Sequence, residues 1–127
     1  MHEKHLYDYA VIRVVPRVER EEFINIGLML FCKRQRYLRI QYHIPKEKIL
    51  SFCPDFDIEQ LQINIEAFTK ICSGKKEGGP IGEFELAERF RWLTAVKSSS
   101  IQTSRPHSGF SENLDKTFDR LYTELVL

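Results

Sequence analysis

The segment from residue 88 to residue 109 carries the side chains of this sequence that are best suited to binding. A short helical pattern there is followed by three serines, a polar stretch with strand-like alternation, and a turn with proline and histidine. Arginine can make paired hydrogen bonds to phosphate or carboxylate, and hydroxyl, amide and imidazole groups can add to them. We therefore expect a binding surface formed by Arg89, Trp92, Lys97, Ser100, Gln102, Arg105 and His107.

Each part of this surface also has an ordinary structural explanation. Trp92 lies off the apolar stripe of its helical pattern, so it either packs on a neighbouring element or contacts a partner. Ser100 and Gln102 would share one face of a short strand, which could equally be a solvated edge strand. His107 is a weak candidate for acid–base catalysis, because an imidazole can both donate and accept a proton. The alternative role for His107 is a hydrogen bond that shapes the turn.

A second basic group surrounds a predicted hairpin turn at residues 33–36. Its cations could contact phosphates, and Tyr37 could stack on a base, which would make the hairpin a candidate nucleic-acid surface. A solvated hairpin tip is the alternative. The cations of this candidate surface are Lys33, Arg34, Arg36 and Arg39.

The sequence predicts no metal site and no cofactor. Cys32, Cys53 and Cys72 are odd in number and too far apart for a zinc motif. Asp8 and Glu22 could pair as carboxylates, but no spacing rule supports this. The lysines at 75–76 lack the glycine and hydroxyl pattern of a P-loop, and the patterns G-x-S-x-G, H-E-x-x-H and C-x-x-C do not occur. Catalytic residues therefore stay unassigned.

Length and composition predict a single domain over residues 1–127. Hydrophobic residues make up 43% of the chain and charged residues 29%, as in ordinary globular proteins. With 19 basic and 18 acidic residues the net charge is +1, so bulk charge gives no argument for nucleic acid or membrane as a partner. The first residues carry charges among their apolar side chains and do not resemble a signal peptide, so we expect the cytoplasm.

Hydrophobic patterning predicts three strands near the start of the chain. Aromatic and β-branched residues favour a strand at Tyr7–Val15, and a nearly continuous apolar run predicts a buried one at Phe23–Cys32. Gly27, inside that run, indicates a bulge or the close approach of a neighbour. Strict alternation predicts a third strand at Tyr37–His43, and short connections make the three an antiparallel meander.

Helical periodicity dominates the rest of the chain. We expect a short helix at 45–51, a longer one capped by Asp57, a mobile glycine-rich loop at 74–82, a helix at 83–93 and a last helix capped by Ser111. This order predicts an α+β fold: an antiparallel sheet of three to five strands, with two main helices and one or two short helices packed on one face. The expected core comprises Phe23, Ile24, Ile26, Leu28, Leu30, Leu61, Ile65, Phe68, Phe118, Leu121 and Leu125.

Several motifs together resemble one family. They are YDYAVIRVV at 7–15, E-F-x-N-x-G at 22–27, R-F-x-W-L at 89–93 and H-x-G at 107–109. On them the chain resembles, over nearly its full length, the small bacterial proteins classed as domain of unknown function family 3037. A proline that commonly follows the tryptophan segment in that family is replaced here by the stretch at 95–97. The positions that match the family pattern are Glu22, Asn25, Gly27, Arg89, Trp92, Ser100, Gln102, His107 and Gly109.

The family has no established activity, and its genes often stand beside genes for HipA-like kinases. The resemblance therefore implies a non-enzymatic accessory protein that acts with such a kinase. One alternative is an enzyme or ligand-binding domain for a phosphorylated or nucleotide substrate, which would use Arg89, Ser100, Gln102 and His107. A further alternative is nucleic-acid binding through the hairpin at 33–39.

Overall fold

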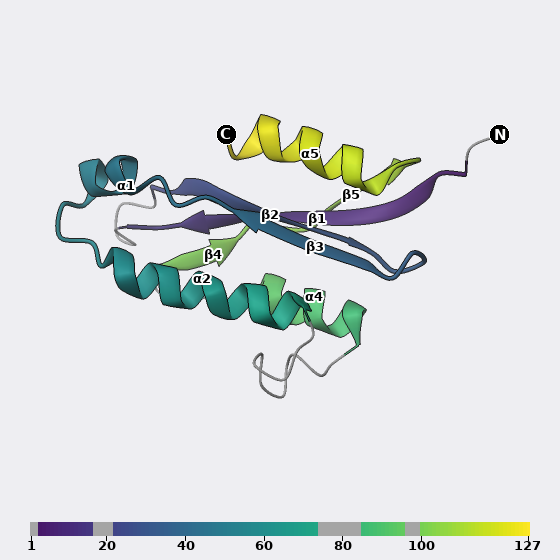
Figure 1. Cartoon of the computed structure of the whole chain (residues 1–127), viewed down its shortest axis with the longest axis horizontal. Coiled ribbons are helices and arrows are strands. Elements are labelled where there is room, and N and C mark those ends of the chain that lie inside the picture. The colour runs from purple at the N-terminus through teal and green to yellow at the C-terminus, as the bar shows by residue number, and fades with distance from the viewer. Residues whose placement is uncertain (1–2, 17–21, 74–84, 96–99) are drawn as a thin grey trace.

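The computed structural model describes residues 3–16, 22–73, 85–95 and 100–127. Its strands are His5–Val14 (β1), Ile24–Cys32 (β2), Tyr37–Tyr42 (β3), Ile101–Thr103 (β4) and His107–Ser111 (β5). Its helices in these ranges are Lys46–Phe52 (α1), Ile58–Ser73 (α2), Leu86–Ala95 (α4) and Leu114–Leu125 (α5) (Figure 1). The loop expected at 74–82 falls outside the described residues, and so does Lys97.

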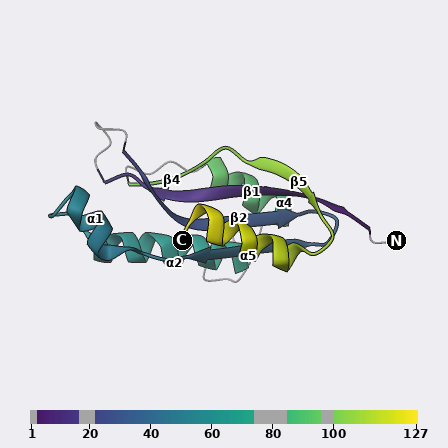
Figure 2. The same ribbon diagram turned by 90° about the horizontal axis from the view of Figure 1, so that it is seen from above.

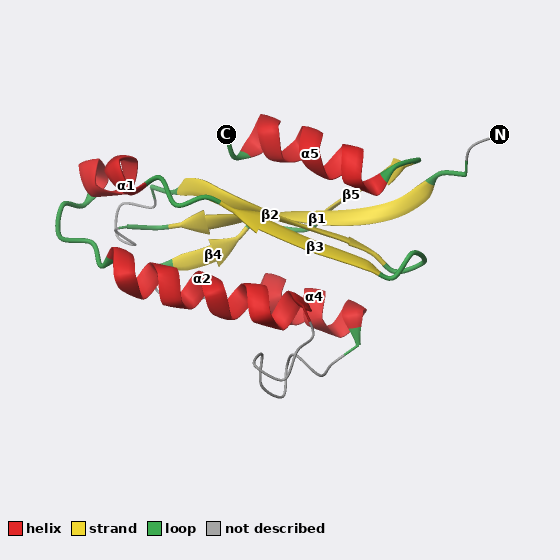
Figure 3. Cartoon of the chain, viewed as in Figure 1, coloured by secondary structure: helices red, strands yellow, loops and turns green. Residues whose placement is uncertain are grey.

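The strands form one antiparallel sheet in the order β3-β2-β1-β4, with β5 also paired to β1. β4 pairs with the end of β1, at Ile12–Val14, and β5 pairs with its beginning, at His5–Tyr9. β4 and β5 therefore lie one after the other along the same edge of β1. The expected class, an α+β fold on an antiparallel sheet, is confirmed (Figure 3).

Ser104 occupies the interruption between β4 and β5. Its backbone N–H donates to the Val11 carbonyl at 2.8 Å, and its side-chain oxygen accepts from the Val11 N–H at 2.9 Å. The Ser104 hydroxyl donates in turn to the carbonyl of Arg105, at 3.0 Å. The side chain thus satisfies a buried N–H of β1 at the point where the neighbouring backbone turns away.

The helices are divided between the two faces of the sheet instead of gathering on one. Helices α2 and α4 lie below the sheet in Figure 1, and α5 lies above it. The reason is that β2 buries side chains on both faces. Ile26, Met29 and Phe31 join the core under α2 and α4, whereas Leu28 and Leu30 join the core under α5.

Gly27 is both a bulge and a point of close approach, as expected. The pairing of β1 with β2 shifts register there, with Ile12 opposite Gly27 and Arg13 opposite Asn25. A side chain at Gly27 would place its Cβ 2.9 Å from the carbonyl oxygen of Gln41 and 3.1 Å from the Cβ of Tyr42. The neighbouring strand β3 therefore packs directly against the glycine backbone.

The helix starts follow local capping chemistry. Asp57 caps α2 as expected, because its carboxylate accepts from the N–H of Gln60 at 3.0 Å. For α5 the cap is Asn113, which accepts from the N–H of Lys116 at 3.1 Å, and the expectation of Ser111 was wrong. Ser111 instead ends β5, and its hydroxyl accepts from the N–H of Asn113.

Two residues expected in the core lie nearer the surface. Phe23 precedes β2 and is 49% exposed, with the guanidinium of Arg13 4.2 Å from the centre of its ring. Leu125, in the last turn of α5, is partly buried against the α5 core. The other residues expected in the core are buried: Ile24, Ile26, Leu28, Leu30, Leu61, Ile65, Phe68, Phe118 and Leu121.

Candidate functional site

Arg89 belongs to α4, and its side chain contacts the end of α2. Its Nη1 donates to the carbonyls of Ile71 and Cys72, at 3.2 and 2.8 Å, near the C-terminal end of α2. Helix-end carbonyls have no partner within their own helix and carry partial negative charge, so a guanidinium there ties the two helices together. Burial raises the pKa of the Cys72 thiol to about 12, although the charge of Arg89 lowers it. Arg89 thus has a structural contact in the layer of α2 and α4.

Trp92 and Arg91 lie on the outward side of the same helix. Phe90 and Leu93 face the core, while Trp92 is 38% exposed. β4 is tied to this helix through Thr103, whose hydroxyl donates to the carbonyl of Thr94 at 3.0 Å. The tryptophan therefore belongs to the outer surface of α4, below the sheet in Figure 1.

Gln102 and His107 lie on the other face of the sheet. Gln102 is the cross-strand partner of Arg13, and His107 is the partner of Tyr9. Cross-strand partners point to the same face, and residues 9 and 13 of β1 share a face because side chains alternate along a strand. Tyr9 packs against the core under α5, so this is the α5 face.

These four residues lie on one face as two cross-strand pairs, which we call the open strip: Tyr9 with His107, and Arg13 with Gln102. Figure 2 shows α5 on the β2 side of the sheet, so none of the helices in the described ranges lies on this face over β4 and β5. The rings of Tyr9 and His107 lie 5.4 Å apart between centroids. His107 is exposed, and the other three are half-buried. Two of the expected residues thus share this surface, which Arg89 and Trp92 do not reach.

Arg13 gives the open strip its cation. Its guanidinium rests on the ring of Phe23, and its Nε is buried with no hydrogen-bond partner in the described part of the chain. A buried donor without a partner is costly, by roughly 1–3 kcal/mol. The sequence contained a signal for this residue, namely a single arginine within the apolar run of β1, but we had not assigned it a role.

The remaining residues expected at the surface have separate positions. Ser100 accepts from the N–H of Val15 through its backbone carbonyl, at 2.7 Å, and is half-buried. Arg105 is exposed, in the interruption of the edge strand. Ser104 uses its hydroxyl within the fold, as described above. Of the six expected residues that the structure describes, Gln102 and His107 share a face, and the other four lie elsewhere; the binding role of each stays a prediction.

Two of the motif residues explain how this face is built. The side-chain amide of Asn25 donates to the carbonyl of Leu125 at 3.1 Å and so holds the end of α5 against β2. Gly109 lies under the ring of Tyr7, because a Cβ there would be 2.6 Å from the Tyr7 hydroxyl oxygen. Glu22 is half-buried just before β2.

The basic hairpin is partly committed to contacts within the protein. Arg39 makes ion pairs with Asp115 and Asp119 of α5, each at 3.3 Å, and lies 4.1 Å from the centroid of Phe118. The Tyr37 hydroxyl donates to Asp115 at 2.7 Å, and burial together with this bond raises its pKa to about 12. Lys33, Arg34 and Arg36 are exposed at the turn, where Arg36 adopts a φ of 50°.

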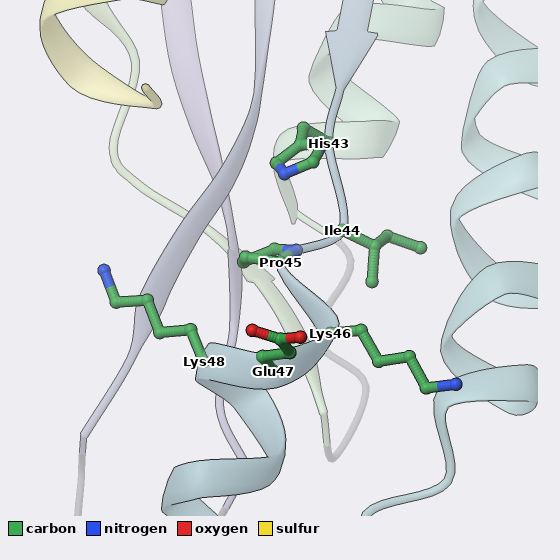
Figure 4. A pocket seen from close by; sticks show the side chains of 6 residues that line it. All are labelled: His43, Ile44, Pro45, Lys46, Glu47 and Lys48. Atoms are coloured by element: carbon green, nitrogen blue, oxygen red, sulfur yellow. The ribbon is translucent and has the colours of Figure 1, made fainter.

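A cavity of about 390 Å³ lies where β3 leads into α1, but its side chains do not converge. It is lined by one continuous segment, residues 43–48. Figure 4 shows the side chains of Lys46 and Lys48 pointing in opposite directions, with Glu47 between them. This arrangement offers no common point at which a ligand could be held.

A comparison with known families gives a clear result. Residues 9–126 match the family model described as Protein of unknown function (DUF3037). The chain belongs to this family. The DUF3037 match includes every residue of the open strip. No curated protein and no solved structure matches the chain.

None of the helices in the described ranges combines the length and the apolar character needed to span a bilayer. No group of three or more His, Cys, Asp and Glu side chains in these ranges is placed to hold a metal ion.

Proposed function

We propose that this DUF3037 protein is a non-enzymatic interaction protein that binds a partner protein through the open strip. One observation carries the proposal: α5 covers part of its face of the sheet, and the cross-strand pairs Tyr9–His107 and Arg13–Gln102 lie on that same face. Tyrosine and arginine are the residue types that contribute most at protein interfaces.

The strip is suited to recognition because its backbone is rigid. Arg13 and Tyr9 belong to the central strand β1, which is paired on both sides. The backbone of such a strand is already ordered before a partner binds. Less of the binding free energy is therefore offset by a loss of conformational entropy. Phe23, which is 49% exposed beside Arg13, extends the strip with an aromatic ring.

A phosphorylated or nucleotide ligand is the second candidate. The anion site expected from the sequence included Arg89, which lies in the opposite layer and contacts α2. Arg13 provides a different cation beside Gln102, and the pairing of this guanidinium with an amide on one face favours an anionic ligand. An open strip of sheet surrounds a small molecule less completely than a concave pocket does, so we place the protein partner first.

The proposed partner is a HipA-like kinase, as the family resemblance suggests, and the proposed location is the cytoplasm. Three free cysteines support that location, because a reducing compartment keeps thiols unpaired. All three are buried: Cys32, Cys53 and Cys72.

Co-purification with the kinase encoded by a neighbouring gene tests the proposal. Gln102→Ala combined with His107→Ala truncates the strip at two side chains that are not fully buried, so the fold should survive. We expect this double variant to lose at least about tenfold in affinity. Trp92→Ala is the matched control in the opposite layer and should bind as the unchanged protein does.

The opposite result would move the contact surface to α4. If Trp92→Ala abolishes the complex and the strip variant retains it, the proposal is wrong. Titration with ADP, followed by backbone amide shifts, tests the second candidate. Binding that Arg13→Gln weakens about tenfold would replace the protein partner with an anionic ligand.

A further inference from the structure

A second surface lies at the end of the sheet near the N-terminus, away from the proposed interface. It is a cavity of about 520 Å³, which we call the end pocket, lined by Lys4, His5, Leu6, Lys33, Arg34 and Phe110. These residues come from the start of β1, from β5 and from the turn between β2 and β3. In Figure 1 this is the end of the sheet that extends past the helices.

The floor of the end pocket is apolar and uncovered. Leu6 and Phe110 are cross-strand partners, so their side chains lie next to each other on one face. They are 55% and 69% exposed, and neither belongs to either core cluster. Adjacent large apolar side chains left in water at a cavity are typical of a site that a partner covers.

The rim of the end pocket is cationic. Lys4, Lys33 and Arg34 are exposed around it, and Glu3 is the acidic residue that pairs there, with Arg34 at 3.0 Å. Both members of that pair are largely exposed, so a carboxylate from a partner could replace Glu3 at little cost. Since the whole chain carries a net charge of +1, this positive charge is local.

The turn that brings the cations to the pocket is held against β1. The Gln35 side chain lies 3.4 Å from the His5 ring nitrogen, and the Arg34–Glu3 pair joins the same two segments. Lys33 and Arg34 are therefore kept close to Leu6. The apolar floor and the positive rim form one surface made of two separate segments of the chain.

We propose that the end pocket binds an acidic, extended peptide segment of a partner protein. One apolar side chain of the segment rests on Leu6 and Phe110, and neighbouring carboxylates contact Lys4, Lys33 and Arg34. A nucleic acid is less suited to this surface, because base stacking needs aromatic platforms and half of the apolar floor is aliphatic. Tyr37 and Arg39 of the hairpin are turned toward α5 and contact Asp115 there.

The test uses a short fluorescent peptide of glutamates with one central leucine, and its affinity for the full chain is measured by fluorescence anisotropy. We expect Phe110→Ala to weaken binding by about tenfold or more. Lys33→Gln combined with Arg34→Gln should weaken it and reduce its dependence on salt. Ile63→Ala and Lys70→Gln, which change exposed residues of α2, are the matched controls and should leave binding unchanged.

Several outcomes would overturn the proposal. They are no binding at millimolar peptide, equal binding of a peptide whose central leucine is replaced by alanine, or tighter binding of a short oligouridylate at the same residues. Analytical ultracentrifugation would show whether the chain associates with itself. Self-association that is abolished by Phe110→Ala would assign the pocket to a second copy of the chain instead. The open-strip variant Gln102→Ala with His107→Ala should bind the peptide normally, so this test and that of the kinase interface can fail separately.

Discussion

The two faces of the sheet are built from the same strands but are covered in different ways. On one face, α2 and α4 lie side by side, and Arg89 of α4 joins them by donating to the carbonyls at the end of α2. On the other, α5 is the one helix of the described ranges that packs on the core, over β2. The face with two helices is closed over the middle of the sheet, whereas the face with one helix keeps the open strip.

The two faces also differ in what attaches the helices. Besides its apolar core, α5 is held by polar contacts at both ends: Arg39 and Tyr37 bind Asp115, and Asn25 binds the Leu125 carbonyl. Contacts of this kind fix where a helix lies along a sheet more than they add to stability. The extent of helical cover therefore determines which strand residues are available for binding.

The largest expected loss of stability follows from truncating a fully buried side chain in the core of either face. Phe118→Ala, on the α5 face, should lower the free energy of unfolding by about 3–5 kcal/mol, since Phe118 is fully buried. Urea denaturation would measure this. Hydrogen exchange in the same variant should show the amides of α5 opening before those of β1 and β2, because α5 is the only helix in the described ranges that packs on that core.

Ile65→Ala is the matched change on the other face, where the residue is also fully buried. It should cost about 2–5 kcal/mol, but α2 and α4 should keep their protection relative to the sheet. If α5 proves as resistant to exchange as α2 in both variants, the distinction between the two faces fails.

Gly27→Ala should have the next largest effect. The new Cβ would meet the backbone carbonyl of Gln41 at 2.9 Å, which cannot move without shifting β3, so we expect a loss of about 1–3 kcal/mol in thermal or urea unfolding. Gly109→Ala is the comparison, because its Cβ would meet the far end of the Tyr7 side chain. If Gly109→Ala lowers the free energy of unfolding more than Gly27→Ala does, the α5 face is the more tightly packed of the two.

Removing the cation that joins β3 to α5 should have a smaller effect. Arg39→Gln loses two ion pairs and the contact with the Phe118 ring, for a cost of about 1 kcal/mol that decreases in high salt. Arg34→Gln, which loses an exposed pair with Glu3, should change stability by a few tenths of a kcal/mol or less. Urea curves at low and high salt would compare them.

The last effect is confined to alkaline pH. The pKa of Tyr37 is about 12 in the folded protein and about 10 in the unfolded chain. The protonated Tyr37 hydroxyl therefore makes its full contribution to the free energy of unfolding below pH 10, and this contribution is lost as the pH rises toward 12. Cys72, with a pKa also raised to about 12, adds to this alkaline loss. The gap in stability between the protein and Tyr37→Phe should narrow from pH 10 to pH 12; a constant gap would contradict the role given to the hydroxyl.

Much of the fold could be predicted because its signals are local. Alternation marks β3, the Asp57 cap marks the start of α2, and the glycine in β2 marks the bulge. The distribution of helices over two faces could not be predicted in the same way. A continuous apolar run such as β2 shows that both faces are buried, but it does not show which helix covers each face.

The candidate site was harder to predict because it depends on long-range register. Gln102 and His107 share a face because of their pairing with Arg13 and Tyr9, which are about 90 residues or more away in sequence. Arg89 was expected near them because it is close in sequence. Its contacts with Ile71 and Cys72 depend on how α4 packs on α2, which no local pattern specifies.

The interruption at Ser104 has a consequence for the behaviour of the protein in concentrated solution. A long, flat strand with free backbone groups at the border of a sheet can recruit strands from other molecules and begin a fibril. Here that border is divided into two short pieces by the sequence Ser104-Arg105-Pro106, and proline has no N–H to offer an incoming strand. The same serine that completes the bonding of β1 thus helps to keep neighbouring molecules from polymerising.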